Sequence, residues 1–116
     1  MIGIDLIKTS RMERMLERFG DKALSRFLSP SEILLVKNYK TAAGFWAVKE
    51  ACSKALGVGI SSECGFHDII ITKTDRGAPQ VSLVSEKLDY FKIEKMACSI
   101  THDGEYAIAV VTFQSY

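Results

Sequence analysis

The sequence predicts a small α+β domain in which an antiparallel sheet packs against helices. Strand-like alternation opens the chain at residues 2–6, three helical segments follow between residues 10 and 57, and the other strand-like segments lie in the second half. Strands outside a block of helices favour an α+β sandwich over a doubly wound parallel sheet, in which strands and helices alternate. We expect residues 1–116 to form a single domain.

Composition fits a compact enzyme or binding domain. The chain has 116 residues, of which 47% are hydrophobic, and that fraction is enough for a packed core. Fifteen basic side chains oppose fourteen acidic ones, so nothing demands a nucleic-acid partner. No signal peptide or segment of transmembrane length is apparent, and three widely spaced cysteines suit reduced thiols rather than a disulfide framework. We therefore expect a cytoplasmic protein without a membrane partner.

The first element is a strand. Ile2, Ile4 and Leu6 alternate with Gly3 and Asp5, which is the period-two pattern of a half-buried strand. Asp5 therefore points away from the apolar row.

Two helix starts follow. Ser10 with Glu13 forms a possible capping box for a helix that ends before residue 20. Ser29, Pro30 and Glu32 repeat the signal, with Ser29 as the cap and Pro30 at the first helical position, so a second, short helix is expected there.

A third helix is expected over residues 41–56, ending at Gly57. It has an apolar stripe and a separate face that carries polar and charged groups. The apolar stripe contains Phe45, Val48, Cys52, Ala55 and Leu56, and the other face contains Trp46, Glu50, Ser53, Lys54 and Gly57.

The second half reads mainly as strands. One hairpin is expected through a turn at residues 75–77, and a second through a turn at residues 102–104. The expected strands are 68–73, 79–84, 96–101 and 106–113, with weak helical periodicity over 85–92. The continuous apolarity of the last strand indicates burial on both sides or at a subunit interface.

Asp5 and Glu50 are candidate ligands of a magnesium ion if the third helix packs on the first strand. Magnesium takes one or two protein carboxylates and completes its shell with phosphates and water. Two such carboxylates are more often solvated or salt-bridged. Lys54 and Lys49 can either pair with a carboxylate or reach a phosphate, and His102 can either bind phosphate, transfer a proton or serve only as a turn residue.

Three segments taken together resemble the ordered motifs of bacterial holo-acyl-carrier-protein synthases, which are phosphopantetheinyl transferases. The segments are residues 3–5 (Gly-Ile-Asp), 46–54 (Trp-Ala-Val-Lys-Glu-Ala-Cys-Ser-Lys) and 99–103 (Ser-Ile-Thr-His-Asp). Arg11, residues 29–32 and residues 77–79 also match that family's pattern.

The resemblance implies transfer of 4'-phosphopantetheine from coenzyme A to a serine of apo-acyl carrier protein, for fatty acid biosynthesis. It also implies a homotrimer with active sites at subunit interfaces and Mg²⁺ held by Asp5 and Glu50. By the same resemblance Arg11 and Arg14 meet the carrier, within a basic segment spanning residues 8–26.

The resemblance further assigns coenzyme A contacts. Lys54 would contact its phosphates and assist catalysis, His102 would bind the nucleotide end, and the turn from Gly77 to Pro79 would lie near adenine. The other residues assigned to coenzyme A are Lys49, Ser53, Ser99 and Thr101. The proton of the carrier serine has three candidate acceptors, which are Glu50, a metal-bound water and His102.

The chain departs from the family pattern at two positions. Phe45 replaces a frequent arginine, for which Lys40 is a candidate substitute, and Ala78 replaces a basic residue. Two rival functions remain at this point. One is a noncatalytic trimeric module that binds acidic carriers through residues 8–26, and the other is a small metal-dependent phosphohydrolase that needs no carrier.

Overall fold

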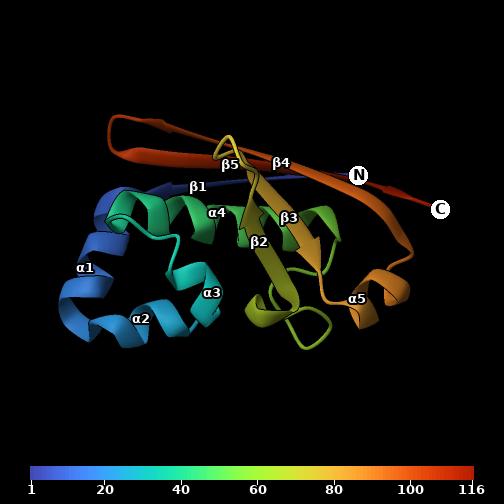
Figure 1. Cartoon of the computed structure of the whole chain (residues 1–116), viewed down its shortest axis with the longest axis horizontal. Coiled ribbons are helices and arrows are strands. Elements are labelled where there is room, and N and C mark those ends of the chain that lie inside the picture. The colour runs from blue at the N-terminus through green and yellow to red at the C-terminus, as the bar shows by residue number, and fades with distance from the viewer.

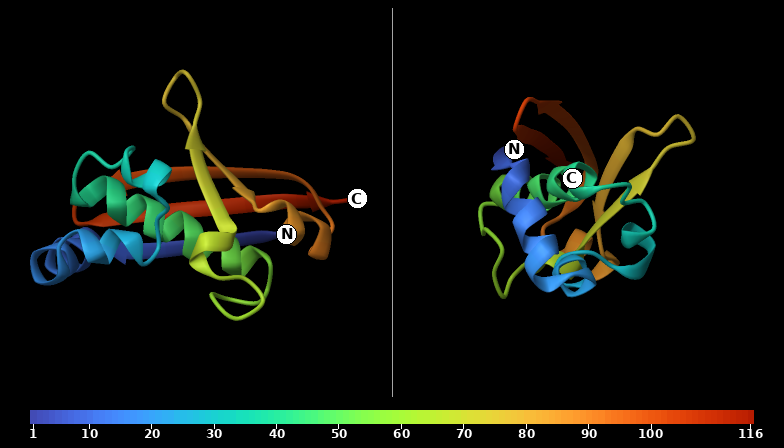
Figure 2. Two further views of the ribbon diagram at one scale, coloured as in Figure 1. Left: turned by 60° about the horizontal axis from the view of Figure 1, so that its bottom comes forward. Right: turned by 90° about the vertical axis from the view of Figure 1, so that its left-hand side faces the viewer.

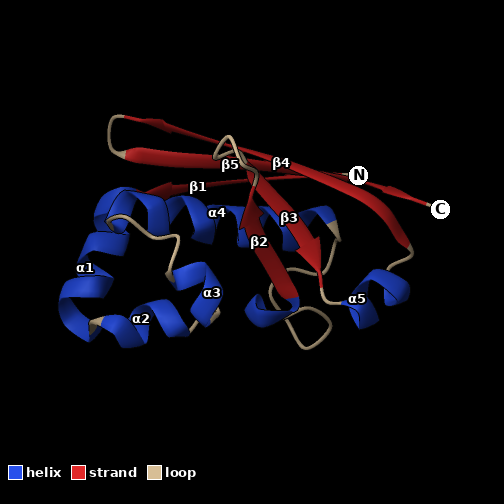
Figure 3. Ribbon diagram, viewed as in Figure 1, coloured by secondary structure: helices blue, strands red, loops and turns tan.

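The computed structural model describes residues 1–116 as a mixed helical and stranded fold (Figures 1 and 3). Antiparallel strands and helices occur together, so the predicted α+β class is confirmed. The strands are β1 (Ile2–Lys8), β2 (Ile69–Lys73), β3 (Pro79–Leu83), β4 (Ile93–Asp103) and β5 (Tyr106–Ser115). The helices are α1 (Thr9–Phe19), α2 (Asp21–Ser25), α3 (Pro30–Ile33), α4 (Tyr39–Ala55) and α5 (Ser85–Tyr90), with a 3-10 turn at Phe66–Asp68.

Two antiparallel sheets flank the long helix α4. The larger has the strand order β1-β5-β4, so the first strand pairs with the last one and both chain ends lie at the same end of the molecule (Figure 1). The smaller sheet is the β2–β3 hairpin, whose tip projects away from the rest of the molecule (Figure 2). Helix α4 thus lies between the three-stranded sheet and a layer formed by α1 to α3 and the β2–β3 hairpin.

The face of β1 that packs on α4 is not the one suggested by its apolar row. Gly3 and Ile7 are buried and Asp5 is half-buried on the covered face, whereas Ile2 and Ile4 are 68% and 60% exposed. Period-two alternation is present, but the covered face is the one that carries Gly3, Asp5 and Ile7. The physical reason is the close approach of α4, which leaves no room for a row of large side chains on that face.

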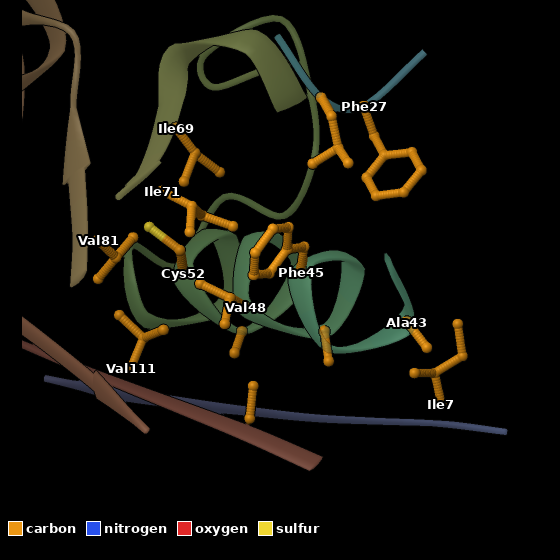
Figure 4. Packing of buried hydrophobic residues seen from close by; sticks show 14 of the residues in the cluster. Ile7, Phe27, Ala43, Phe45, Val48, Cys52, Ile69, Ile71, Val81 and Val111 are labelled. Atoms are coloured by element: carbon orange, nitrogen blue, oxygen red, sulfur yellow. The ribbon is translucent and has the colours of Figure 1, made fainter. Parts of the chain in front are cut away.

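The core surrounds α4 (Figure 4). Phe45 and Val48 pack toward β2 and the chain around Phe27, while small residues of α4 face the three-stranded sheet. Ala107 and Ala109 of β5 are fully buried beneath the helix. Each large side chain removed from water in this way contributes about 1.5–3 kcal/mol.

Helix boundaries follow the caps. The predicted capping box at Ser29 is confirmed, because its hydroxyl accepts from the Glu32 amide and the Glu32 carboxylate accepts from the Ser29 amide at 2.7 Å. Helix α4 begins at Tyr39 because the Asn38 side chain accepts from two amides of the first turn. The predicted Ser10 cap is wrong, since α1 already begins at Thr9.

Two further elements differ from the sequence prediction. A short helix, α2, follows Gly20, where no helix was predicted. Strand β4 runs through His102 to Asp103, so the turn of the last hairpin is Gly104-Glu105. His102 is therefore a strand residue with a fixed side-chain direction.

Candidate active site

The first half of the candidate site lies where β1 meets the last two turns of α4. Lys54 Nζ donates to Asp5 Oδ1 at 2.8 Å and to the Ile4 carbonyl at 3.2 Å. The Lys54 side chain is half exposed, so this ion pair is weak and reorganises readily. The Asp5 carboxylate is thus paired with an ammonium group, so this position favours a positive charge.

Glu50 belongs to the same cluster, because its carboxyl interacts with the charges of Asp5, Lys54 and Arg11. Burial raises the pKa of its carboxyl above the ordinary 4.5, the nearby Asp5 carboxylate raises it further, and Lys54 and Arg11 oppose the shift. Two carboxylates that repel one another in a partly desolvated place suit a divalent cation, because Mg²⁺ needs only one or two protein oxygens beside phosphate and water. The donor set therefore fits the predicted magnesium site.

Lys49 does not belong to this cluster. Its ammonium is fully buried and donates to Glu32 Oε1 at 2.8 Å, to the Phe27 carbonyl at 2.6 Å and to the Phe66 carbonyl at 3.0 Å. All three of its donors are used inside the protein. The sequence-based assignment of Lys49 to coenzyme A is therefore wrong, because the side chain points into the core.

Ser53 is also unavailable to a ligand. Its side chain is fully buried, and its hydroxyl donates to the Glu50 carbonyl one turn earlier at 2.7 Å. Its assignment to coenzyme A is likewise wrong. Ser53 shares a predicted helix face with Glu50 and Lys54, but unlike the half-exposed Lys54 it is fully buried.

The second half of the candidate site is a pocket of about 240 Å³ on the β4 side of α4. Its polar lining comes from Lys37, Thr41, Lys73 and His102, and Pro79 also contributes to the lining. His102 and Pro79 were predicted from sequence, whereas the two lysines and the threonine were not. The remaining lining residues are Gly44, Phe45 and Ile100.

Contacts within the pocket fix two of its side chains. The Nε2 atom of His102 lies 2.9 Å from the Lys40 carbonyl, which can only accept, so Nε2 carries a proton in this contact. Lys73 Nζ lies 5.8 Å from the centre of the Phe45 ring. The ring that replaces the family arginine thus has a cation over its face.

The two halves lie on opposite edges of the three-stranded sheet. Asp5 is on β1 and His102 is on β4, with β5 between them. Two strand spacings separate the edge strands by about 10 Å. The pocket that contains His102 is not lined by Asp5, Glu50 or Lys54 of the same chain, so the two halves are separate within one chain.

Ser99 and Thr101 lie on a third surface. They pair with Val110 and Ile108 of β5 and share the outer face of the sheet with Ile4. Because successive strand residues point to opposite faces, these hydroxyls point away from His102 of the same chain. Within one chain they therefore do not line the pocket.

The basic segment forms an exposed surface on α1 and α2. Arg11 and Arg14 are both exposed, as a docking face requires. Arg18 and Arg26 lie on the ring of Phe19, which is 45% exposed, at 5.2 and 5.6 Å from its centre. None of the helices combines the length and the apolar character needed to cross a bilayer.

Comparison with known proteins gives a consistent result. A family model described as the 4'-phosphopantetheinyl transferase superfamily matches residues 1–111. The chain is 65% identical over 115 residues to the holo-acyl-carrier-protein synthase of Sulfurimonas denitrificans, with 99% of this chain and 95% of that protein covered. It is 53% identical over 116 residues to the protein of the same name from Helicobacter pylori, with 99% and 98% covered.

Solved structures agree with these relatives. The crystal structure of Helicobacter pylori holo-acyl-carrier-protein synthase in complex with coenzyme A superposes with a TM-score of 0.96 at 51% identity, covering 98% of this chain and 100% of that chain. The Bacillus anthracis synthase in complex with CoA (3',5'-ADP) superposes with a TM-score of 0.83 at 35% identity, covering 99% and 96%.

Proposed function

The chain belongs to the 4'-phosphopantetheinyl transferase superfamily, and we propose that it works as a composite enzyme whose active site is completed by a second copy of the chain. It transfers 4'-phosphopantetheine from coenzyme A to a serine of apo-acyl carrier protein and leaves adenosine 3',5'-bisphosphate. The separation of the two half-sites within one chain is the observation that carries the composite arrangement.

A second copy has a surface on which to dock. Ile2, Ile4 and Leu6 are 68%, 60% and 54% exposed on the outer face of the sheet, where they continue into Ile108 and Val110. An exposed apolar face of this kind marks an interaction surface. In a homotrimer whose subunits contact one another through this face, the Asp5 side of one copy would lie beside the His102 side of its neighbour. Ser99 and Thr101 would lie at the same interface.

In each composite site Asp5 and Glu50 would hold Mg²⁺. The cation, when bound, would offset the negative charge that builds up on the diphosphate of coenzyme A. Lys54 would leave Asp5 and neutralise a diphosphate oxygen, since its ammonium is half exposed and already within reach of that position.

The nucleotide end of coenzyme A would occupy the pocket with Lys37, Lys73 and His102. A bisphosphorylated nucleotide needs several positive or donating groups, and the two lysines supply the charge that the family arginine would bring at position 45. Gly77, whose φ of +83° suits a tight turn, and Pro79 would lie beside adenine. Thr41 adds a hydroxyl donor at the start of α4.

The serine of the carrier would attack the β-phosphate of coenzyme A, so the enzyme needs no nucleophile of its own. Glu50 or a metal-bound water would take the serine proton, because both would lie at the carboxylate cluster where the diphosphate binds. His102 is better suited to nucleotide binding, since it lies at the pocket. Carrier docking would use Arg14 and the exposed α1 surface, with Arg11 close to Glu50 at its inner end.

Mass spectrometry of the carrier tests the function. The chain is incubated with apo-acyl carrier protein, coenzyme A and Mg²⁺, and the carrier gains the mass of one phosphopantetheine group. A carrier that binds but gains no mass would favour the noncatalytic module. Nucleotide release without carrier would favour a phosphohydrolase. We place the reaction in cytoplasmic fatty acid biosynthesis.

A further inference from the structure

Gly3 makes the tightest approach of any glycine in the chain. A Cβ atom at this position would lie 2.0 Å from the Ala51 carbonyl oxygen and 2.5 Å from the Ala55 nitrogen. Both are backbone atoms of α4, so no side-chain rotation relieves the clash. Real Cβ contacts stay beyond about 3 Å, so any other residue would push strand and helix apart by about 1 Å.

Backbone conformation does not explain this glycine. The glycines with positive φ are Gly20, Gly57, Gly59, Gly77 and Gly104, and Gly3 is not among them. It lies in a regular strand and pairs with Val111 of β5. A glycine inside a strand otherwise weakens the strand. We therefore attribute the glycine at this position to the close approach of the α4 backbone.

The clash site adjoins the carboxylate cluster. Gly3 and Asp5 lie two residues apart on the same face of β1, and the helix residues nearest Gly3, Ala51 and Ala55, directly follow Glu50 and Lys54. The separation of β1 and α4 at Gly3 therefore sets the separation of Asp5 from the two functional side chains of the helix. The Lys54–Asp5 contact of 2.8 Å exists at this separation.

We propose that Gly3 is a positioning residue of the transfer reaction: its missing side chain lets β1 approach the backbone of α4 closely enough for Asp5 and Glu50 to share one cation. The inference rests on the proposed metal site. Mg²⁺ and Mn²⁺ bind through short, geometrically strict bonds to oxygen, so an added separation of about 1 Å is not absorbed by the ion. Misplacements of this size cost catalytic sites about 100-fold.

Gly44 provides a matched control. It lies on the same helix, at the β4 side of the same interface, and a Cβ there would meet only side-chain atoms, the nearest being Ile100 Cγ2 at 3.2 Å. Gly44→Ala therefore adds the same methyl group between helix and sheet without forcing the backbones apart. It is far from the carboxylates and is compared only for metal binding and stability.

The test is a Mn²⁺ titration of the full chain, with free Mn²⁺ followed by electron paramagnetic resonance and thermal unfolding measured in parallel. Gly3→Ala is expected to weaken Mn²⁺ binding at least tenfold, whereas Gly44→Ala changes it less than twofold. Asp5→Glu, whose side chain is longer by one methylene, is expected to restore part of the lost affinity when added to Gly3→Ala. A merely structural role of Gly3 predicts no such rescue.

Several outcomes decide the inference. Wild-type Mn²⁺ affinity in Gly3→Ala, or a loss that Asp5→Glu does not reduce, overturns it. If Gly3→Ala does not fold, Ala51→Ser replaces it as the test, because it adds a single atom at the buried helix–sheet contact. Ala51→Ser is expected to weaken Mn²⁺ binding about threefold. An unchanged Mn²⁺ affinity in Ala51→Ser overturns the inference as well. Asp5→Asn and Glu50→Gln variants that bind Mn²⁺ like the unmodified chain would instead remove the metal site itself, and the inference with it.

Discussion

The buried ion pair between Lys49 and Glu32 makes the strongest prediction about stability. Lys49→Met keeps most of the apolar stem of the side chain, which becomes one atom shorter, and removes its charge. The Glu32 carboxylate would keep its bonds from the amides of Ser29 and Ile71, both at 2.7 Å, but would lose its only counter-ion. The carbonyls of Phe27 and Phe66 would lose a donor as well.

The size of the effect follows from the burial. The two side chains are 0% and 2% exposed, so water does not replace the missing ammonium. Removing one partner of such a pair costs about 3–5 kcal/mol, a large part of the roughly 5–15 kcal/mol that stabilises a domain. Glu32→Gln leaves a buried ammonium and should cost about as much. The double variant should lose less than the sum of the two, with a coupling of about 1 kcal/mol or more.

Urea unfolding followed by fluorescence of Trp46 measures these values. Lys54→Met is the matched control, because it makes the same change at a half-exposed lysine and should cost under about 1 kcal/mol. A stability loss of less than about 1 kcal/mol in Lys49→Met would refute this role of the ion pair. Strictly additive stability losses in the double variant would refute it as well, because the pair would then not connect α4 to β2 and to the chain before α3.

Three further predictions concern titration and charge. The raised pKa of Glu50 means that the folded state binds the Glu50 proton more tightly than the unfolded chain does. Above the raised pKa, the ionised carboxylate therefore destabilises the metal-free fold. This destabilisation disappears as pH falls toward 4.5. Glu50→Gln should therefore raise the thermal midpoint at pH 7 but not at pH 4, and a lower midpoint at pH 7 would contradict this. Lys54→Gln should tighten Mn²⁺ binding in the absence of coenzyme A, because the Lys54 ammonium competes with the cation for Asp5. The same variant should bind coenzyme A more weakly in calorimetry. Weaker Mn²⁺ binding would contradict the competition. Burial raises the pKa of Cys52 to about 12 and of Cys98 to about 11, so thiol reagents at pH 8 should label the folded chain far more slowly than the unfolded one, and equal rates would exclude these shifts.

Local chemistry made several features predictable. The Ser29 capping box is encoded within four residues, and the helix that carries Glu50 and Lys54 was placed within two residues of its true start. Asp5 and Glu50 were brought together by the family resemblance and by the expectation that helix and strand pack, and the shift of the Glu50 pKa by Asp5 is consistent with it.

Tertiary packing decided what sequence patterns did not. Ile2, Ile4 and Leu6 look like a core row, but α4 covers the other face of β1 because only Gly3 permits its close approach. Lys49 looks like a surface cation on a helix, yet three acceptors from distant segments surround its ammonium. No local pattern identifies such acceptors.

The pocket lysines were missed for a related reason. Lys37 precedes α4 and Lys73 ends β2, and neither lies in a motif. They meet only because the β2–β3 hairpin folds against the first turns of α4. Distance across the fold, rather than spacing along the chain, defines this half of the site.

The central claim is that each active site combines the carboxylates of one copy with the pocket of another, and subunit mixing tests it most directly. Glu50→Gln and a His102→Ala/Lys73→Gln variant are each unfolded, mixed in equal amounts, refolded together and assayed for carrier modification by mass spectrometry. In a closed ring with random mixing, about a quarter of the interfaces pair two intact halves, so the mixture should recover about a quarter of the wild-type rate although each variant alone is inactive. A mixture no more active than the separate variants would contradict the composite site.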